Sequence, residues 1–376
     1  MKIVFVSHNA YMQGGAQSVL LDLVRGIRKF CPDYFLYVIF PDNGPLIDVF
    51  LPHINGYTII KQPGWMLDPK KKSLYKSFWE VTRFIRHARR TLIYLNQIKP
   101  DVVVTNTIFS PVAALASKWG KYRHLWFIHE VPVESKSYAF LYPEKALVRW
   151  VGRYSDKILA VSDHVLKHYM PLLIDADGIY RIHYSVEIDQ SIEFKRDDFR
   201  YTFLLVGNFN DNKGQKEAIE ACRILKETYN IPFRLLLVGA GDDAYSNAVR
   251  KLVKEMGLDE EVKIISFTTD VFTFYRQADV LLMCSASEGL PKVVVEAQKY
   301  GIPVIATAIP ANKELIEHGY NGLFYHRGNI SVLVSAMEKL SHSDLRMDIG
   351  KNAICFMKDR YNLEQFVKEF VKYCRF

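Results

Sequence analysis

The segment from Ala278 to Gly301, ADVLLMCSASEGLPKVVVEAQKYG, constrains the fold of this chain more than any other. It opens with the apolar run Val280–Met283, which is short and apolar enough to form a fully buried strand. A polar turn containing a glycine follows. Pro291 suits the first turn of a helix, because the N–H groups of that turn have no intrahelical partner. The segment therefore predicts a strand, a tight turn and a helix, the repeating unit of a parallel α/β sheet.

Two carboxylates in this segment, Glu288 in the turn and Glu296 in the helix, are placed to face one ligand. In a parallel sheet such a turn lies at the carboxyl ends of the strands, and the N–H groups that open the helix attract phosphate. The spacing of the two glutamates is weak by itself, because glutamates on helices are usually solvated. The buried strand, Gly289 and Pro291 around them favour a nucleotide site over a solvated face.

The sequence SEGLPKVVVEA resembles the signature of glycosyltransferase family 4, retaining enzymes of the GT-B architecture that use nucleotide-sugar donors. The resemblance covers nearly the whole chain and is strongest over residues 201–325. It implies an α/β fold with two Rossmann-like, doubly wound domains that face each other across a cleft. We expect an acceptor-binding domain at 1–185, a donor-binding domain at 186–360, and a helix at 361–376 that crosses back to the first domain.

The resemblance also implies roles for individual donor-site residues. Glu288 would contact hydroxyls of the donor sugar, and Glu296 would contact the ribose hydroxyls. Backbone N–H groups at Gly289 and Leu290 would face the diphosphate. Lys213, in the turn GNFNDNKGQ, would bind the same diphosphate, whereas without the resemblance it reads as a solvated loop lysine.

The turn that contains this lysine departs from the family pattern at Asn208. Family members usually have an arginine there, so the donor site of this chain has one positive charge fewer, which Lys292 could replace. Gly14 and Gly15 follow the first predicted strand, where the family has a Gly-rich loop that closes over the donor phosphates; alone, the pair predicts only a tight turn. His129 follows another predicted strand, where the family often has a histidine close to the reacting sugar, and the alternative is a structural histidine.

These features predict a retaining hexosyl-type glycosyltransferase. It would move a sugar from a nucleoside-diphosphate sugar to a hydroxyl of a saccharide or lipid-linked acceptor, in polysaccharide or glycoconjugate biosynthesis. The predicted catalytic residues are His129, Glu288 and Lys213. Two alternatives stay open: another GT-B enzyme, such as a nucleotide-sugar epimerase or phosphorylase, and a non-catalytic partner that binds sugar nucleotides.

No metal or other cofactor is expected. No carboxylate presents itself as a nucleophile, so we expect front-face transfer, in which the leaving diphosphate accepts the proton of the acceptor hydroxyl. The pair Asp242–Asp243 resembles the metal-binding motif of the GT-A architecture, but it follows a Gly-rich turn late in the chain, where GT-B proteins have a G-x-G turn. The five cysteines are scattered without a C-x-x-C pair, so neither a disulfide framework nor a zinc site is indicated.

Positive charge is concentrated in the first half of the chain. Residues 1–185 carry 24 Lys and Arg against 14 Asp and Glu, whereas residues 186–376 carry 25 against 27. Within 69–99, apolar residues follow helical spacing, and a second stripe lies on the opposite face. This basic stripe consists of Lys72, Lys76, Trp79, Arg83, Arg86 and Arg90. It is either the solvated side of a core helix or a patch for an anionic membrane surface.

Hydropathy and the first residues bear on location. No run reaches the roughly 18 apolar residues of a membrane span, and MKIVFVSHNA leads directly into a strand instead of a signal peptide. We therefore expect a cytoplasmic protein that the basic stripe holds at the inner face of the membrane. Nucleic acid is not an expected partner, because no recognition motif accompanies the charge.

Overall fold

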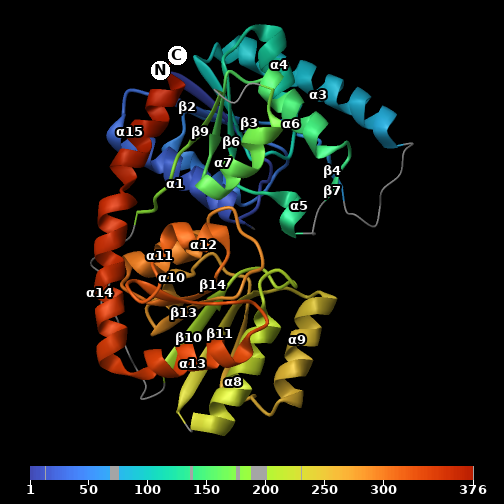
Figure 1. Cartoon of the computed structure of the whole chain (residues 1–376). Coiled ribbons are helices and arrows are strands. Elements are labelled where there is room, and N and C mark those ends of the chain that lie inside the picture. Colours follow the sequence, from blue (N-terminus) through green and yellow to red (C-terminus); the bar gives the residue numbers. More distant parts are fainter. Residues whose placement is uncertain are drawn as a thin grey trace. The chain divides into compact units, whose positions relative to one another are not determined.

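The computed structural model contains two parallel sheets, one in each of two compact units (Figure 1). The first unit comprises Met1–Ser185 and Leu363–Phe376, and the second comprises Val186–Asn362. The residues that the structure describes are 1–12, 14–67, 76–135, 139–174, 178–187, 201–229 and 231–375, with the backbone alone at 67, 76–80, 135 and 139.

The sheet of the first unit has seven parallel strands in the order β3-β2-β1-β5-β6-β8-β9. These are β1 (Lys2–Val6), β2 (Phe35–Phe40), β3 (Gly56–Ile59), β5 (Val102–Asn106), β6 (His124–Ile128), β8 (Lys157–Ala160) and β9 (Ile179–Arg181). Every residue of β5 and β6 is buried, as expected for central strands of a parallel sheet covered on both faces. Val4 of β1 pairs with Tyr37 on one side and Val103 on the other. The direction of winding therefore reverses between β1 and β5, where such folds bind ligands.

Helices connect these strands, and one of them comes from the end of the chain. They are α1 (Gly15–Phe30), α2 (Leu46–Phe50), η1 (Leu51–His53), α3 (Lys76–Ile98), α4 (Val112–Gly120), α5 (Pro132–Ser135), α6 (Glu144–Arg153), α7 (Asp163–Tyr169), η3 (Met170–Leu172) and α15 (Leu363–Cys374). A small antiparallel pair, β4 (Met66–Leu67) and β7 (Ala139–Phe140), completes the unit. The apolar face of α15 packs on α1, where a Cβ at Gly26 would lie 2.6 Å from a methyl group of Val367.

The sheet of the second unit has six parallel strands in the order β12-β11-β10-β13-β14-β15. They are β10 (Tyr201–Val206), β11 (Phe233–Ala240), β12 (Val262–Ser266), β13 (Val280–Met283), β14 (Val304–Thr307) and β15 (Gly322–Tyr325). Phe203 of β10 pairs with Leu235 of β11 and Val280 of β13. The winding reverses between β10 and β13, so the loops after these two strands leave the same edge as neighbours.

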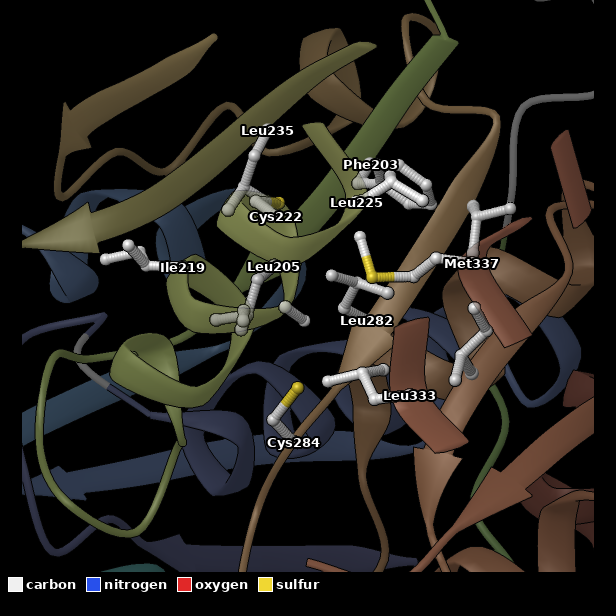
Figure 2. Packing of buried hydrophobic residues seen from close by; sticks show 14 of the residues in the cluster. Phe203, Leu205, Ile219, Cys222, Leu225, Leu235, Leu282, Cys284, Leu333 and Met337 are labelled. Atoms are coloured by element: carbon white, nitrogen blue, oxygen red, sulfur yellow. The ribbon is translucent and has the colours of Figure 1, made fainter. Parts of the chain in front are cut away.

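Seven helices of the described chain cover this second sheet. They are α8 (Gln215–Tyr229), α9 (Ala244–Glu255), α10 (Phe272–Tyr275), α11 (Lys292–Lys299), α12 (Pro310–Leu315), α13 (Ile330–Ser341) and α14 (Ser343–Arg360). Figure 2 shows the core between α8, α13 and the sheet, where Cys222 and Leu225 of α8 approach Phe203 and Leu282 of the strands and Met337 of α13. Each fully buried side chain of this size contributes about 1.5–3 kcal/mol to folding.

The predicted α/β fold with doubly wound parallel sheets is confirmed. Two helix starts were predicted wrongly. The apolar pattern predicts a helix from Ser18 to Phe30, but α1 begins three residues earlier, at Gly15, because the extended Gly14 acts as its N-cap. Pro291 is the N-cap of α11 rather than part of its first turn. The charged stretch 181–200, which lacks periodicity, predicts the hinge between the domains, and most of it lies outside the described residues. Among helices of the described chain, none combines the length and apolarity needed to cross a bilayer.

Candidate active site

The two loops at the reversal point of the second sheet bring together the residues that the sequence singled out. Lys213 lies in the loop after β10, and Glu288 lies in the loop after β13. The Nζ atom of Lys213 is 2.5 Å from Oε1 of Glu288. Both side chains retain some exposure, 24% for the lysine and 15% for the glutamate, so solvent screens the pair only in part. The pairing was not predicted, because the sequence assigned the two residues to different groups of a ligand.

Asn212 ties these two loops together. Its Oδ1 atom accepts a hydrogen bond from the Ser287 N–H at 3.1 Å, and its Nδ2 donates to the Ser287 carbonyl at 2.9 Å. The Asn212 carbonyl in turn accepts from the Ala286 N–H at 2.8 Å. Each bond joins a residue next to Lys213 with a residue next to Glu288. The position of the ion pair therefore depends on Asn212, which the sequence analysis missed.

Glycine allows the two backbones to approach this closely. Gly214 has φ +72°, and a Cβ on it would lie 2.4 Å from the carbonyl oxygen of Cys284. No other residue adopts that φ and leaves that space. Gly207, at the start of the same loop, lies against the aliphatic part of the Lys213 side chain. A Cβ at this glycine would be 3.4 Å from Cδ and Cε of the lysine. The loop thus holds the stem of Lys213 against the end of β10.

The second predicted carboxylate, Glu296, lies in α11 and has polar contacts separate from the pair of Lys213 and Glu288. It is only 8% exposed. Its Oε1 lies 3.3 Å from Nζ of Lys292, four residues earlier on α11. Its Oε2 accepts a 2.8 Å hydrogen bond from the hydroxyl of Tyr275. Lys292 is the first residue of α11 and contacts Glu296, and its part in binding a donor stays a prediction. The sequence analysis missed Tyr275.

The other predicted donor residues line the same edge of the sheet. Asn208 follows β10, and its carbonyl accepts a 3.3 Å hydrogen bond from the Gln215 side chain. Gly289 and Leu290 lead into α11, and Leu290 is buried. The contacts assigned to these residues with a ligand stay predictions. Asp243, which resembled a metal-binding motif, is the N-cap of α9, and its carboxylate accepts from the backbone N–H groups of the first turn.

The reversal point of the first sheet contains a buried polar group around His129. Its Nε2 is 2.7 Å from Oδ1 of Asn106 at the end of β5, so the imidazole donates and the amide oxygen accepts. His8, after β1, is 3.0 Å from the side-chain nitrogen of Gln17 in α1. Burial lowers the pKa of His129 to about 3 and that of His8 to about 4, and the proximity of His8 lowers the pKa of His129 further. Both rings are therefore neutral near pH 7.

Gly14 is the N-cap and Gly15 the first residue of α1, the helix that contributes the glutamine to this group. Glu130 follows His129 and is half-buried. Burial raises the pKa of its carboxyl to about 7, against a smaller opposing effect of the hydrogen bond that it accepts from the Ile108 N–H. Asn106, Gln17 and His8 had no motif that identified them; only their positions at strand ends, once the strand order is known, could have done so.

The predicted basic stripe lies on α3 as far as the structure describes it. Arg83, Arg86 and Arg90 are exposed. Lys72 lies outside the described residues, and only the backbone is described at Lys76 and Trp79. The buried face is only partly the one that the apolar spacing predicts, which runs through Val81, Ile85, Ala88, Leu92 and Leu95. Ala88 and Leu95 are buried as predicted, whereas Val81 is 42% exposed and Phe84, His87 and Thr91 are also buried.

Two adjoining family profiles account for most of the chain. The profile described as Glycosyltransferase Family 4 matches residues 13–190, and the one described as Glycosyl transferases group 1 matches residues 187–355. The chain belongs to glycosyltransferase family 4. The family predicted from SEGLPKVVVEA is therefore confirmed, and the chain is a glycosyltransferase.

Individual relatives agree with this assignment. An uncharacterized glycosyltransferase of Haemophilus influenzae is 24% identical over 375 residues, which cover 98% of both proteins. A capsular polysaccharide biosynthesis glycosyltransferase of Staphylococcus aureus is 25% identical over 175 residues, 46% of this chain and 49% of that protein. Among solved structures, Anabaena Alr3699/HepE in complex with UDP matches with a TM-score of 0.78 at 18% identity over 99% of each chain. The two units of this glycosyltransferase are those of the GT-B architecture.

Proposed function

We propose that this glycosyltransferase transfers a hexosyl group from a nucleoside-diphosphate sugar to a hydroxyl with retention of anomeric configuration and without a metal ion. The observation that carries the proposal is the pair of Lys213 and Glu288, fixed at the reversal point of the second sheet. A cation and a carboxylate side by side there match the two ends of one donor, its diphosphate and its sugar hydroxyls.

The leaving diphosphate gains charge during transfer, so its stabilisation is the largest catalytic demand. Lys213 would meet this demand together with the N-terminus of α11, with Gly289 and Leu290 beside it. Lys292 would supply the second cation in a chain that has Asn208 where its family has arginine. Its 3.3 Å contact with Glu296 places it beside the residue that we assign to the ribose hydroxyls.

His129 would orient the donor sugar as a neutral group. With a pKa lowered to about 3, its ring at pH 7 can form hydrogen bonds but carries no charge. Its Nε2–H is directed to Asn106, which leaves Nδ1 as the acceptor for a sugar hydroxyl. Glu288 is held by a lysine, which favours contact with hydroxyls over attack on the anomeric carbon. We therefore infer front-face transfer, with the diphosphate accepting the proton of the incoming hydroxyl.

The acceptor would be a saccharide or a lipid-linked saccharide used in polysaccharide or glycoconjugate assembly. The capsular polysaccharide relative supports this class of acceptor. We further propose a cytoplasmic protein that meets the inner membrane surface through α3, where Arg83, Arg86 and Arg90 are exposed on one face. Each such cation beside anionic lipid is worth about 1 kcal/mol.

The donor is identified by thermal unfolding with UDP, GDP, dTDP, ADP and CMP sugars, with and without EDTA. A ligand at 100 times its dissociation constant raises the free energy of unfolding by about 2.7 kcal/mol. One nucleotide that stabilises equally in EDTA supports the metal-independent donor site. Stabilisation that EDTA abolishes would contradict it, and no response to any of these compounds would favour a different ligand.

Turnover then tests the role of Lys213. We expect Lys213→Ala to lower kcat more than tenfold, because the leaving diphosphate loses its nearest cation. Lys263→Ala, which removes an exposed lysine from β12 of the same unit, is the matched control and should retain normal turnover. Near-normal activity of Lys213→Ala would refute the assignment. Product analysis without an acceptor separates the remaining alternatives: a new sugar nucleotide indicates an epimerase, and binding without any product indicates a non-catalytic partner.

A further inference from the structure

A basic hollow lies at the amino-terminal edge of the first sheet, away from the residues assigned above. It has a volume of about 250 Å³, several times the roughly 30 Å³ that one water molecule occupies in the liquid. Its lining includes the cations Lys118, Lys121, Arg123 and Arg153 and a single acid, Asp156. His124, at the start of β6, also lines it, whereas His129 follows the end of that strand. Five residues of strand separate the two, roughly 16 Å at about 3.3 Å per residue.

The fold brings these cations together from three places in the sequence. Helix α4 ends at Gly120, and Lys121 follows as a left-handed C-cap with φ 57°. Helix α6 ends at Arg153. The neighbouring strands β6 and β8 begin at the same edge, where the His124 N–H donates to Oδ2 of Asp156 at 2.7 Å and the Asp156 N–H donates to the His124 carbonyl at 2.8 Å. This reciprocal pair of hydrogen bonds fixes the backbone that lines the hollow between the cations.

The charges of the hollow do not balance. Cations at helix C-termini are favourable by themselves, because each helix end carries about half a negative charge. The ends of α4 and α6 together with Asp156 therefore offset about two of the three positive charges of Lys118, Lys121 and Arg153, and about one remains. Lys118, Lys121 and Arg153 are exposed and form no ion pair with any residue of the described chain. Helix capping alone does not account for this excess.

We propose that this hollow binds a phosphate group. A phosphate monoester carries close to two negative charges at pH 7, so a group of this kind would be attracted by the excess positive charge. Guanidinium groups bind phosphate oxygens through paired N–H donors, and lysines add point charges. Two tyrosines and a serine in the lining supply neutral polar groups. His124 also lines the hollow; the residue is 1% exposed, and its Nδ1 has no hydrogen-bond partner within the described chain.

The group can belong to a soluble phosphate compound or to a lipid headgroup, and the two sources are separated experimentally. Titration calorimetry at constant ionic strength measures inorganic phosphate and glycerol 3-phosphate against the full-length protein. Flotation with phosphatidylcholine vesicles that contain phosphatidic acid measures the lipid source. Saturable binding of the soluble compounds, or flotation that they compete away, supports the site and names its source.

The site is located with the double variant Lys121→Gln/Arg153→Gln, in which side-chain length is retained and two charges are removed. We expect its dissociation constant for phosphate to rise at least tenfold. The control Lys145→Gln/Lys167→Gln removes the same charge from exposed positions of the same unit, on α6 and α7, and should bind as the unaltered protein does. Lys213→Ala should also leave this binding unchanged. Equal weakening in both double variants, or no saturable binding of phosphate in either form, would overturn the proposal.

Discussion

Replacing Asn212 with alanine isolates the contact that joins the two halves of the candidate donor site. The side chain makes two hydrogen bonds to the backbone of Ser287, at 3.1 and 2.9 Å. Asn212→Ala removes both bonds but keeps the backbone bond from the Ala286 N–H. The loops would stay in contact, but the distance between Lys213 and Glu288 would no longer be fixed.

The size of the effect follows from these two bonds. A typical intramolecular hydrogen bond contributes about 0.5–1.5 kcal/mol net, and both bonds are partly buried, so the loss should be about 2 kcal/mol. The second unit spans 186–362. For a domain of that size, each kcal/mol shifts Tm by about 2–4 °C, so we expect its unfolding transition to fall by about 4–8 °C. The loosened ion pair should also lower kcat, while Asn212 itself contacts no reacting group.

Differential scanning calorimetry measures the transition, and a transfer assay on the same preparation measures kcat and KM. Asn247→Ala, an exposed asparagine on α9, is the matched control and should shift Tm by less than about 1 °C. Asn212→Asp retains the acceptor of the Ser287 N–H and should recover part of the stability. If Asn212→Ala unfolds as the unaltered protein does and keeps its kcat, the idea that this residue positions the pair is refuted.

Three further predictions concern stability. Gly214→Ala should lower the free energy of unfolding by more than about 2 kcal/mol, because the left-handed φ costs about 1–2 kcal/mol and the new Cβ meets the Cys284 carbonyl at 2.4 Å; Gly257→Ala, with φ +62° and open space, measures the φ cost alone in the same thermal assay. Urea unfolding as a function of pH should show the free energy of unfolding falling as pH drops below about 6.5. The reason is that the pKa of His129 in the folded protein is lowered to about 3, so the unfolded chain binds a proton that the folded chain does not. His129→Gln should make this pH dependence less steep, and an unchanged slope would contradict the prediction. Glu130 acts oppositely, because its raised pKa of about 7 gives stability that is full below about 4.5 and is lost as pH rises through 7, a loss that Glu130→Gln should remove.

Local sequence patterns predicted the fold well because parallel strands are apolar along their whole length. Val280–Met283 is buried at every position, as its composition indicated. The alternation of such runs with helical segments predicted a mainly parallel sheet, and the resemblance to the family added the two doubly wound domains. The positions of Lys213 and Glu288 after their strands followed from the same reasoning, since loops after neighbouring parallel strands leave a sheet at one edge.

The buried faces of helices were predicted less well, because the spacing of apolar residues along a helix is compatible with more than one buried side. On α3, the step from Val81 to Ile85 and Ala88 fitted a core-facing stripe, yet the buried positions begin at Phe84. His87 is buried on that face although its type suggested a polar position. Burial and the neighbouring arginines on the same helix lower its pKa, so the neutral ring behaves as a partly apolar side chain.

Side-chain partners across the sheet could not be predicted at all, and they change how the donor site is understood. Asn212 and Ser287 are 75 residues apart, and Tyr275 reaches Glu296 across 21 residues. The sequence presents each site residue as free for a ligand, whereas the structure pairs Lys213 with Glu288 and Lys292 with Glu296. Each cation of the site is therefore already balanced by a carboxylate. A diphosphate that draws on either lysine must share it with a glutamate, and the glutamate released from that contact gains an oxygen with which to bind a sugar or ribose hydroxyl. With the donor roles proposed above, donor binding and sugar recognition would be coupled through these two ion pairs, and two lysines would serve a chain that has Asn208 where its family usually has an arginine.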